Sequence, residues 1–187
     1  MYKQQIFQSD SDLPEKLKWQ ILSFLRFNAP EGFIGSNENR DWINNPEDDS
    51  THIAITTEND ILISYCAVVK KQLKHADETY KCWGLTGVMV YPPFRGKGFG
   101  KQVVDIGTKI IKEGNVDIGM FHCNHNLKDF YTKSGWEPME NTTTIKGNKE
   151  NPRKSDELMM ALFLSDKAKS HKSVFETKPV YFGEETW

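Results

Sequence analysis

The chain has 187 residues, of which 37% are hydrophobic and 12% aromatic, so it can bury a core and does not resemble a disordered protein. Its formal net charge of −2 offers no basic face for nucleic acid, and we expect no nucleic-acid partner. The most apolar run, residues 61–69, is too short to span a bilayer, and no signal-peptide pattern opens the chain. We therefore expect one cytoplasmic domain over residues 1–187, without a membrane partner.

The first half of the chain predicts a strand, a helix, a long loop and a set of further strands. Residues 2–7 predict the opening strand, and residues 10–12 are good N-caps for a helix with the apolar face Leu17, Ile21, Leu22 and Leu25. Residues 28–45 contain two aromatic side chains and predict an ordered, functional loop. Further strands are predicted at 52–57, at 61–70 and from 79 onward, with turns at 58–60 and 74–78.

The second half predicts a strand at 116–121, a short helix at 127–134 and a last strand at 157–164. Between the last two, residues 141–155 are polar and predict a surface loop, while residues 171–187 predict an irregular, aromatic-rich tail. Strands followed by a strand–helix–strand–helix–strand order indicate a mixed α/β sheet with helices on both faces.

Residues 85–112 combine a strand, a glycine-rich turn and a helix. Val88 to Tyr91 predict a buried strand, which Pro92 and Pro93 end because proline donates no ladder hydrogen bond. RGKGFG follows at residues 95–100, and a helix is then predicted from the spacing of Val103, Val104, Gly107, Ile110 and Ile111.

This glycine-rich turn predicts an anion site. Glycine lets backbone N–H groups approach a ligand, and the first turn of a helix presents unpaired N–H groups at the positive end of the dipole. Such sites most often hold phosphate. The Walker pattern fails because Arg95 and Gln102 replace its glycine and hydroxyl residue, and the dinucleotide pattern fails at Lys101. A strand–helix connection without a ligand is the alternative.

The pattern that fits is R-x-x-G-x-G, formed by Arg95, Gly98 and Gly100, and here the chain resembles the GNAT acyltransferase superfamily. The resemblance implies a mixed, mostly antiparallel sheet with helices on both faces and a splayed central strand pair. It also implies that the loop holds the pyrophosphate of acetyl-CoA through Arg95, Gly96, Lys97, Gly98, Phe99, Gly100 and Lys101. Val88, Met89 and Val90 would offer backbone groups to the pantetheine arm, and the Val88 N–H would hold the oxyanion.

Residues 126–136, NLKDFYTKSGW, are a second GNAT-like segment. The resemblance implies that Tyr131 is the general acid for the departing thiolate and that Asn126 bonds the pantetheine arm. Proton transfer from a phenol (pKa about 10) to a thiolate (thiol pKa about 8.5) is nearly balanced. The alternative is that Tyr131 only packs.

A general base is harder to identify. An acceptor amine with a pKa of about 10.4 costs roughly 4.6 kcal/mol to deprotonate at pH 7, so a base matters only for a strongly basic substrate. The candidates are His122, and Thr86 acting through a water. Three scattered cysteines without a CxxC pair predict neither disulfides nor zinc, and we expect no metal. Cys123 has no recognisable base partner and is interpreted as packing.

Over nearly its whole length the chain is also similar to the aminoglycoside 2′-N-acetyltransferases within GNAT. The matching features are Asp41 and Trp42, the Gly87–Val88 strand, the Tyr131 segment and a chain that ends in tryptophan. The resemblance implies that the acceptor site comprises Ser36, Asp41, Trp42, Glu185 and the terminal carboxylate of Trp187. Ser36, Thr86 and His122 replace an aspartate, a glutamate and a serine of that group.

The sequence therefore predicts an acetyl-CoA-dependent N-acetyltransferase in which a primary amine of a small, cationic acceptor attacks the thioester directly. The alternatives are another acyl group, a peptide amine, or a module that binds acyl-CoA without turnover. A homodimer stays open.

Overall fold

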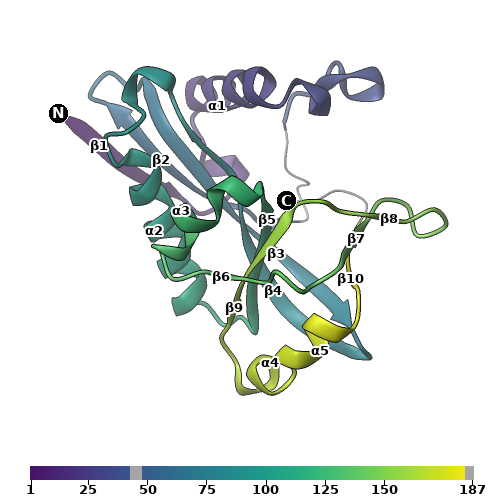
Figure 1. Ribbon diagram of the computed structural model, residues 1–187. Helices are drawn as coiled ribbons and strands as arrows, with labels where there is room; N and C mark the ends of the chain where they lie inside the picture. The colour runs from purple at the N-terminus through teal and green to yellow at the C-terminus, as the bar shows by residue number, and fades with distance from the viewer. Residues whose placement is uncertain (43–47, 184–187) are drawn as a thin grey trace. The chain divides into compact units, whose positions relative to one another are not determined.

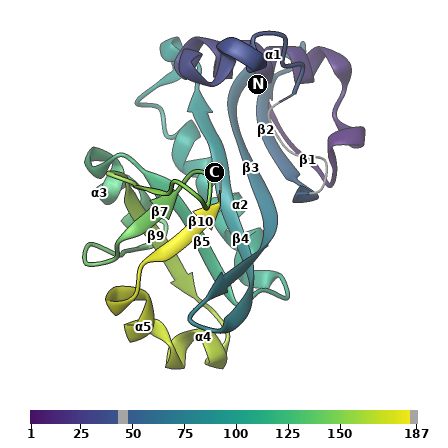
Figure 2. The same cartoon turned by 90° about the vertical axis from the view of Figure 1, so that its right-hand side faces the viewer.

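The computed structural model describes residues 1–42 and 48–183. Contacts divide the chain into two compact units: Met1–Val69 with Gly87–Gly107, and Lys70–Thr86 with Thr108–Trp187. We call these unit 1 and unit 2 and describe each by itself. Two long strands contribute residues to both units, β3 (Leu62–His75) and β4 (Glu78–Val90), and they are drawn as long arrows in Figures 1 and 2. A single domain over residues 1–187 stays a prediction.

Seven strands of the described residues form one sheet in the order β1-β2-β3-β4-β5-β9-β6. The pairs β1–β2, β2–β3, β5–β9 and β6–β9 are antiparallel, while β4–β5 is parallel. The predicted mixed, mostly antiparallel sheet is thus confirmed. The parallel pairing of β4 with β5 covers Cys82↔Ile118 and Trp83↔Gly119, and β5 pairs with β9 along Ile118–Cys123. A splayed central pair stays a prediction.

Unit 1 contains β1 (Tyr2–Phe7), α1 (Glu15–Asn28), β2 (Thr51–Thr57) and the first half of β3. The apolar face of α1 buries Leu17 and Ile21 in a cluster with β2, β3 and β4 residues, among them Ala54, Leu62, Tyr65 and Met89. Short 3-10 turns lie at Asp10–Asp12, Pro30–Phe33, Gly35–Asn37 and Pro92–Phe94.

The predicted caps of the first helix are wrong. Asp10, Ser11 and Asp12 form their own turn, in which Ser9 and Asp12 bond reciprocally, and α1 begins only after Pro14. Proline suits this position because the first helical amides have no intrahelical acceptor. The loop 28–45 is ordered where it is described: Phe33 is buried and Trp42 is half-buried.

Unit 2 places helices on both faces of β5 (Ile118–Cys123), as predicted. Side chains alternate along a strand, so Ile118 and Met120 share one face and pack in a cluster with α4 (Asp166–Ser170) and α5 (Lys172–Thr177). On the other face, Gly119 lies against Ile111 of α2 (Phe99–Glu113). The remaining elements here are α3 (Lys128–Thr132), β6 (Glu137–Pro138) and β9 (Leu158–Phe163).

Two predictions for unit 2 are wrong. The polar segment 141–155 contains β7 (Thr144–Lys146) and β8 (Arg153–Lys154). The supposedly irregular tail forms α5 and then β10 (Val180–Gly183), which pairs in parallel with β7 to complete a three-stranded sheet. β7 and β8 are too short and too polar to show period-2 alternation in the sequence, and β10 has only four residues. These strands form because segments that are distant in the sequence pair with one another.

Candidate functional site

The glycine-rich turn in unit 1 is built as an open cradle at the start of α2. Gly96 and Gly98 have φ of +74° and +84°, values that L side chains rarely adopt, and a Cβ added at either would meet nothing within 4 Å. The first bond of the helix runs from the Gln102 N–H to the Gly98 carbonyl at 3.1 Å. By helix geometry the amides of Phe99, Gly100 and Lys101 therefore have no acceptor within α2. Space and unpaired donors together fit a pyrophosphate.

The basic residues of this loop already have neighbours. The Arg95 guanidinium donates to the Val90 carbonyl at 3.2 Å and to the Asn28 side chain at 3.4 Å. The Lys97 ammonium lies 5.3 Å from the centre of the Phe94 ring, and Lys101 pairs with Asp105 at 2.5 Å. The Phe99 ring is buried against Tyr2, so this residue would serve a ligand only through its backbone.

The end of β4 leads into this loop. Gly87 has φ +60°, which breaks the regular strand conformation, and a Cβ there would lie 3.1 Å from the Tyr65 ring. Met89 points into the core, and its carbonyl accepts the Ser64 hydroxyl at 2.9 Å. Val88 and Val90 are half-buried. Residues 88–90 nevertheless belong to β4, which ends at Val90.

In unit 2, the ring of Tyr131 is 5% exposed and lies edge-on to Phe121 and Phe130, with centroids 4.6 and 4.9 Å away. Its carbonyl accepts the amides of Ser134 and Trp136, which fixes the turn after α3. Asn126 lies in the turn just before α3, where its amide donates to Asn124 and its side chain is exposed. Aromatic packing thus sets the direction of the Tyr131 side chain.

His122, also in unit 2, is the unusual titratable group of this region. Both ring nitrogens are buried without a hydrogen-bond partner, and the ring lies edge-on to Phe182 at 4.2 Å. Burial lowers the pKa of His122 to about 4; the Glu157 carboxylate opposes this shift and the Lys146 ammonium adds to it. The imidazole is therefore neutral at pH 7, with one donor and one acceptor unused.

The other sequence candidates in unit 2 offer less. Thr86 is half-buried on β4. Burial, with a smaller contribution from Glu157, raises the pKa of the Cys123 thiol to about 11, so this cysteine is not a thiolate nucleophile at neutral pH. Within residues 1–42 and 48–183, no group of three or more His, Cys, Asp or Glu side chains could hold a metal ion.

The predicted acceptor residues are only partly described. Ser36 and Asp41 are exposed, whereas the Trp42 indole donates to Asp10 at 2.9 Å and packs against the core of unit 1. Asp41 lines a polar pocket of about 290 Å³ together with Trp19, Arg26, Glu38, Asn39 and Arg40. Glu185 and Trp187 lie outside the described residues.

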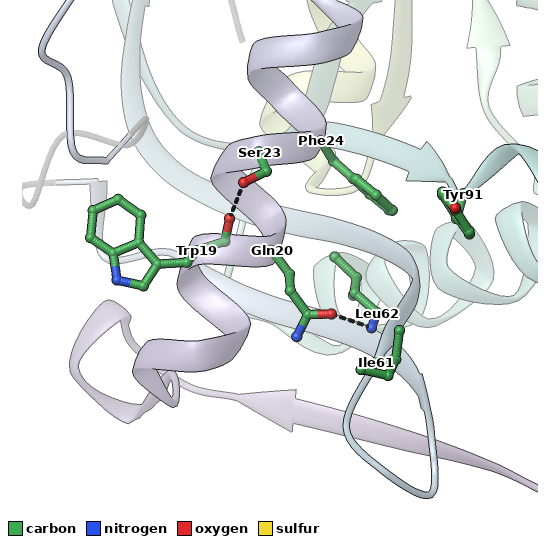
Figure 3. Close-up of a pocket in the computed structure, with 7 residues that line it drawn as sticks. All are labelled: Trp19, Gln20, Ser23, Phe24, Ile61, Leu62 and Tyr91. Carbon is green, nitrogen blue, oxygen red and sulfur yellow. Dashed lines mark hydrogen bonds between the residues drawn. The ribbon is translucent and has the colours of Figure 1, made fainter.

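A second pocket of unit 1, of about 380 Å³, lies beside α1 (Figure 3). Trp19, Phe24, Ile61, Leu62 and Tyr91 give it an apolar lining. Its polar side chains are occupied: Gln20 accepts the Leu62 amide at 2.8 Å, and Ser23 donates to the Trp19 carbonyl at 2.7 Å. The pocket therefore does not match the cationic acceptor that the sequence predicts.

Sequence reasoning missed a buried polar chain in unit 1. Asp10 bonds His52 at 2.7 Å, and the other His52 nitrogen bonds the Tyr65 hydroxyl at 2.7 Å. His52 and Tyr65 are fully buried. A histidine inside the apolar strand 52–57 was the available signal, but its partners lie 42 residues upstream and 13 downstream.

Comparison with known proteins decides the family. The sequence model of the acetyltransferase (GNAT) domain matches residues 6–139, which is more than half of the chain. The chain belongs to the GNAT acetyltransferase family. It is therefore an acyltransferase, as predicted from its loop and its Tyr131 segment. No curated protein matches the sequence.

Solved structures support the GNAT fold. ElaA of Escherichia coli is 20% identical with a TM-score of 0.57, and the match covers 86% of this chain and 99% of ElaA. The GNAT family N-acetyltransferase YhbS of E. coli, solved with CoA, is 14% identical with a TM-score of 0.59, and the match covers 96% of this chain and 88% of YhbS. An aminoglycoside 6′-N-acetyltransferase, solved with coenzyme A, is 16% identical with a TM-score of 0.55, and the match covers 86% of this chain and 97% of that enzyme.

These similarities to other GNAT structures show the fold alone. Among the described helices, none is long and apolar enough to cross a membrane.

Proposed function

We propose that this GNAT protein transfers the acetyl group of acetyl-CoA to a primary amine of a small, cationic acceptor. The observation that carries the proposal is the loop at Gly96 and Gly98, where two left-handed glycines leave open space before the unpaired first-turn amides of α2. This cradle fits a pyrophosphate, and acetyl-CoA would supply the activated thioester. Arg95, Lys97 and Lys101 add positive charge around it.

In the proposed reaction the amine nitrogen attacks the thioester carbon, the C–S bond breaks, and Tyr131 gives its proton to the departing thiolate. The attacking neutral amine loses one proton to solvent and the Tyr131 phenolate regains one from solvent, so the products are the amide, the free thiol and an unchanged tyrosine. The Val88 N–H is the donor we assign to the oxyanion, because Val88 directly follows Gly87, whose φ of +60° is a local irregularity within β4. Asn126 is assigned to the pantetheine arm.

The pKa of His122 argues against this residue as base for a strongly basic amine. Moving a proton from an amine with a pKa of about 10.4 to an imidazole with a pKa of about 4 costs roughly 9 kcal/mol. A weakly basic amine such as that of an amino sugar needs no base, and His122 would then serve as a neutral hydrogen-bonding group. Thr86, through a water, is the other candidate.

The acceptor assignment rests on Asp41, whose carboxylate lines a polar pocket, and on the similarity of residues 41–42 to the aminoglycoside 2′-N-acetyltransferases. A carboxylate beside the indole of Trp19 suits an ammonium group. Ser36, exposed in the same loop, is the third described residue of this proposed acceptor site.

The test is a screen with acetyl-CoA and five amines that represent different classes: kanamycin, glucosamine, spermidine, lysine and a peptide with a free α-amine. Release of free thiol reports turnover, and we expect the aminoglycoside or the polyamine to give the highest kcat/KM. A peptide preference, or turnover only with longer acyl groups, would replace this acceptor or donor class with the corresponding alternative.

The screen is repeated with Tyr131→Phe, which keeps the buried ring and removes one oxygen. Loss of a general acid lowers kcat by about 10² to 10⁴, with little change in the KM for acetyl-CoA. A variant within twofold of wild type would make Tyr131 a packing residue. Tight CoA binding without turnover of any amine would favour a binding module.

A further inference from the structure

One carboxylate oxygen in unit 1 holds two side chains from different parts of the chain. Oδ1 of Asp10 accepts from the Trp42 indole at 2.9 Å and from Nε2 of His52 at 2.7 Å. Because the carboxylate accepts, Nε2 carries the proton and Nδ1 accepts from the Tyr65 hydroxyl. The four side chains therefore follow the order tyrosine, histidine, aspartate and tryptophan. Tyr65 donates to His52, and His52 donates to Asp10.

This row of hydrogen bonds links two places that the proposed function assigns to the reaction. At one end the Tyr65 ring lies 3.1 Å from the position of a Cβ on Gly87, beside the proposed oxyanion donor. At the other end Trp42 follows directly on Asp41, the proposed acceptor carboxylate. Adjacent Cα atoms are about 3.8 Å apart, so holding Trp42 limits where Asp41 can reach.

We propose that Asp10 is a positioning residue that holds Trp42 and thereby sets the place of the acceptor-binding segment. The inference rests on the proposed function, because it needs Asp41 and Trp42 to contact the acceptor. Trp42 is otherwise in contact with the core of unit 1 and with the Lys18 ammonium, 5.3 Å from its ring.

The same residues could instead pass a proton, and the structure favours positioning. Tyr65 is 0% exposed, and burial raises its pKa well above its usual value, so its hydroxyl remains a donor. The acceptor oxygen of Asp10 already takes two hydrogen bonds, one of them from an indole, which does not release its proton.

The first experiment measures KM for the best amine of the panel with acetyl-CoA at saturation. Asp10→Ala and Trp42→Phe should each raise this KM roughly tenfold, with kcat within threefold, since each removes a hydrogen bond to a charged group. Asp10→Asn keeps an oxygen that accepts from both partners and should stay within threefold of wild type. The double variant Asp10→Ala/Trp42→Phe should not exceed the larger single effect, because both remove the same contact.

The matched control is Asp12→Ala. Asp12 belongs to the same turn and accepts from the Ser9 amide at 3.1 Å, so its loss loosens the turn without removing the hydrogen bond from Trp42 to Asp10. We expect an unchanged amine KM. Tyr65→Phe removes only the hydrogen bond from the Tyr65 hydroxyl to His52 and should leave kcat and its pH profile unchanged.

Limited trypsin cleavage after Arg40 gives a readout that does not need an acceptor. Asp10→Ala and Trp42→Phe should speed this cut roughly tenfold, while Asp10→Asn and Asp12→Ala should not, because local opening controls proteolysis.

If Asp10→Ala has the same amine KM and the same cleavage rate as the wild type, the inference is wrong. It is also wrong if Tyr65→Phe lowers kcat tenfold and shifts its pH profile, because that result indicates proton transfer. If Trp42→Phe has a normal KM, Trp42 is not in the acceptor site and the inference fails with that assignment. If no amine is acetylated, the proposed function fails, and the cleavage assay still decides whether Asp10 holds Trp42.

Discussion

At the scale of single residues, the two histidines inside the strands have opposite environments. His52 has a carboxylate and a hydroxyl within hydrogen-bond distance, whereas both nitrogens of His122 have no partner. Burial lowers the pKa of both histidines. The nearby carboxylate, Asp10 for His52 and Glu157 for His122, raises the pKa and opposes this shift. An unpaired buried polar group costs about 1–3 kcal/mol, so a ligand that bonded His122 would recover part of that cost.

The pKa of His122 makes a prediction about stability. It is about 4 in the folded protein and near 6.5 in the unfolded chain, so between these values the unfolded state binds more protons and stability rises with pH. Acidification from about pH 7.5 to about pH 5 should cost roughly 2 kcal/mol through this group alone. Urea unfolding of His122→Phe, which keeps a ring against Phe182, should show that much less loss than wild type. Equal losses in both proteins would contradict the buried, neutral imidazole.

At the scale of elements, α2 and the segment after α3 approach β5 because β5 carries a glycine at their contact. A Cβ on Gly119 would lie 3.1 Å from the Trp136 ring and 3.2 Å from both Ile111 and Leu162. These neighbours are buried, and the Trp136 indole donates to Thr108 of α2 at 2.8 Å. The Trp136 amide also bonds the Tyr131 carbonyl, so this packing supports the turn that carries Tyr131.

Gly119→Ala should therefore destabilise the protein by about 1–3 kcal/mol, since added volume in a packed core forces its neighbours to shift. The matched control is Gly32→Ala, where a Cβ meets nothing within 4 Å and φ is not left-handed. That substitution should change the free energy of unfolding by less than about 1 kcal/mol. Urea unfolding measures both, and similar values for the two variants would show that β5 has room for a methyl group.

At the scale of the whole molecule, the glycine loop of unit 1 is the proposed binding site for the CoA pyrophosphate, and CoA should therefore affect stability. A ligand that binds only the folded protein stabilises it by mass action. CoA at one hundred times its dissociation constant should add about 2.7 kcal/mol to the free energy of unfolding.

Gly98→Val should abolish this gain, because it fills the open space of the cradle and strains a backbone at φ +84°. Gly147→Val is the matched control. Its φ is +95°, so the substitution carries similar strain, but Gly147 lies in unit 2, directly after β7 and beside Arg153. It should lower stability and keep the CoA gain, as measured by urea unfolding with and without CoA. A full gain in Gly98→Val would place the pyrophosphate elsewhere.

The sequence by itself determined the local features: the strand–loop–helix at residues 85–112, the apolar face of α1 and the acyltransferase family. These features follow from backbone chemistry and from the periodicity of side chains, and both signals lie within one continuous segment of the sequence. Only the tertiary structure decided that the polar segment 141–155 and the tail form one sheet, and that Asp10 joins Trp42 to His52. These contacts join residues far apart in the chain, and their energies come from pairing and burial that no local pattern records.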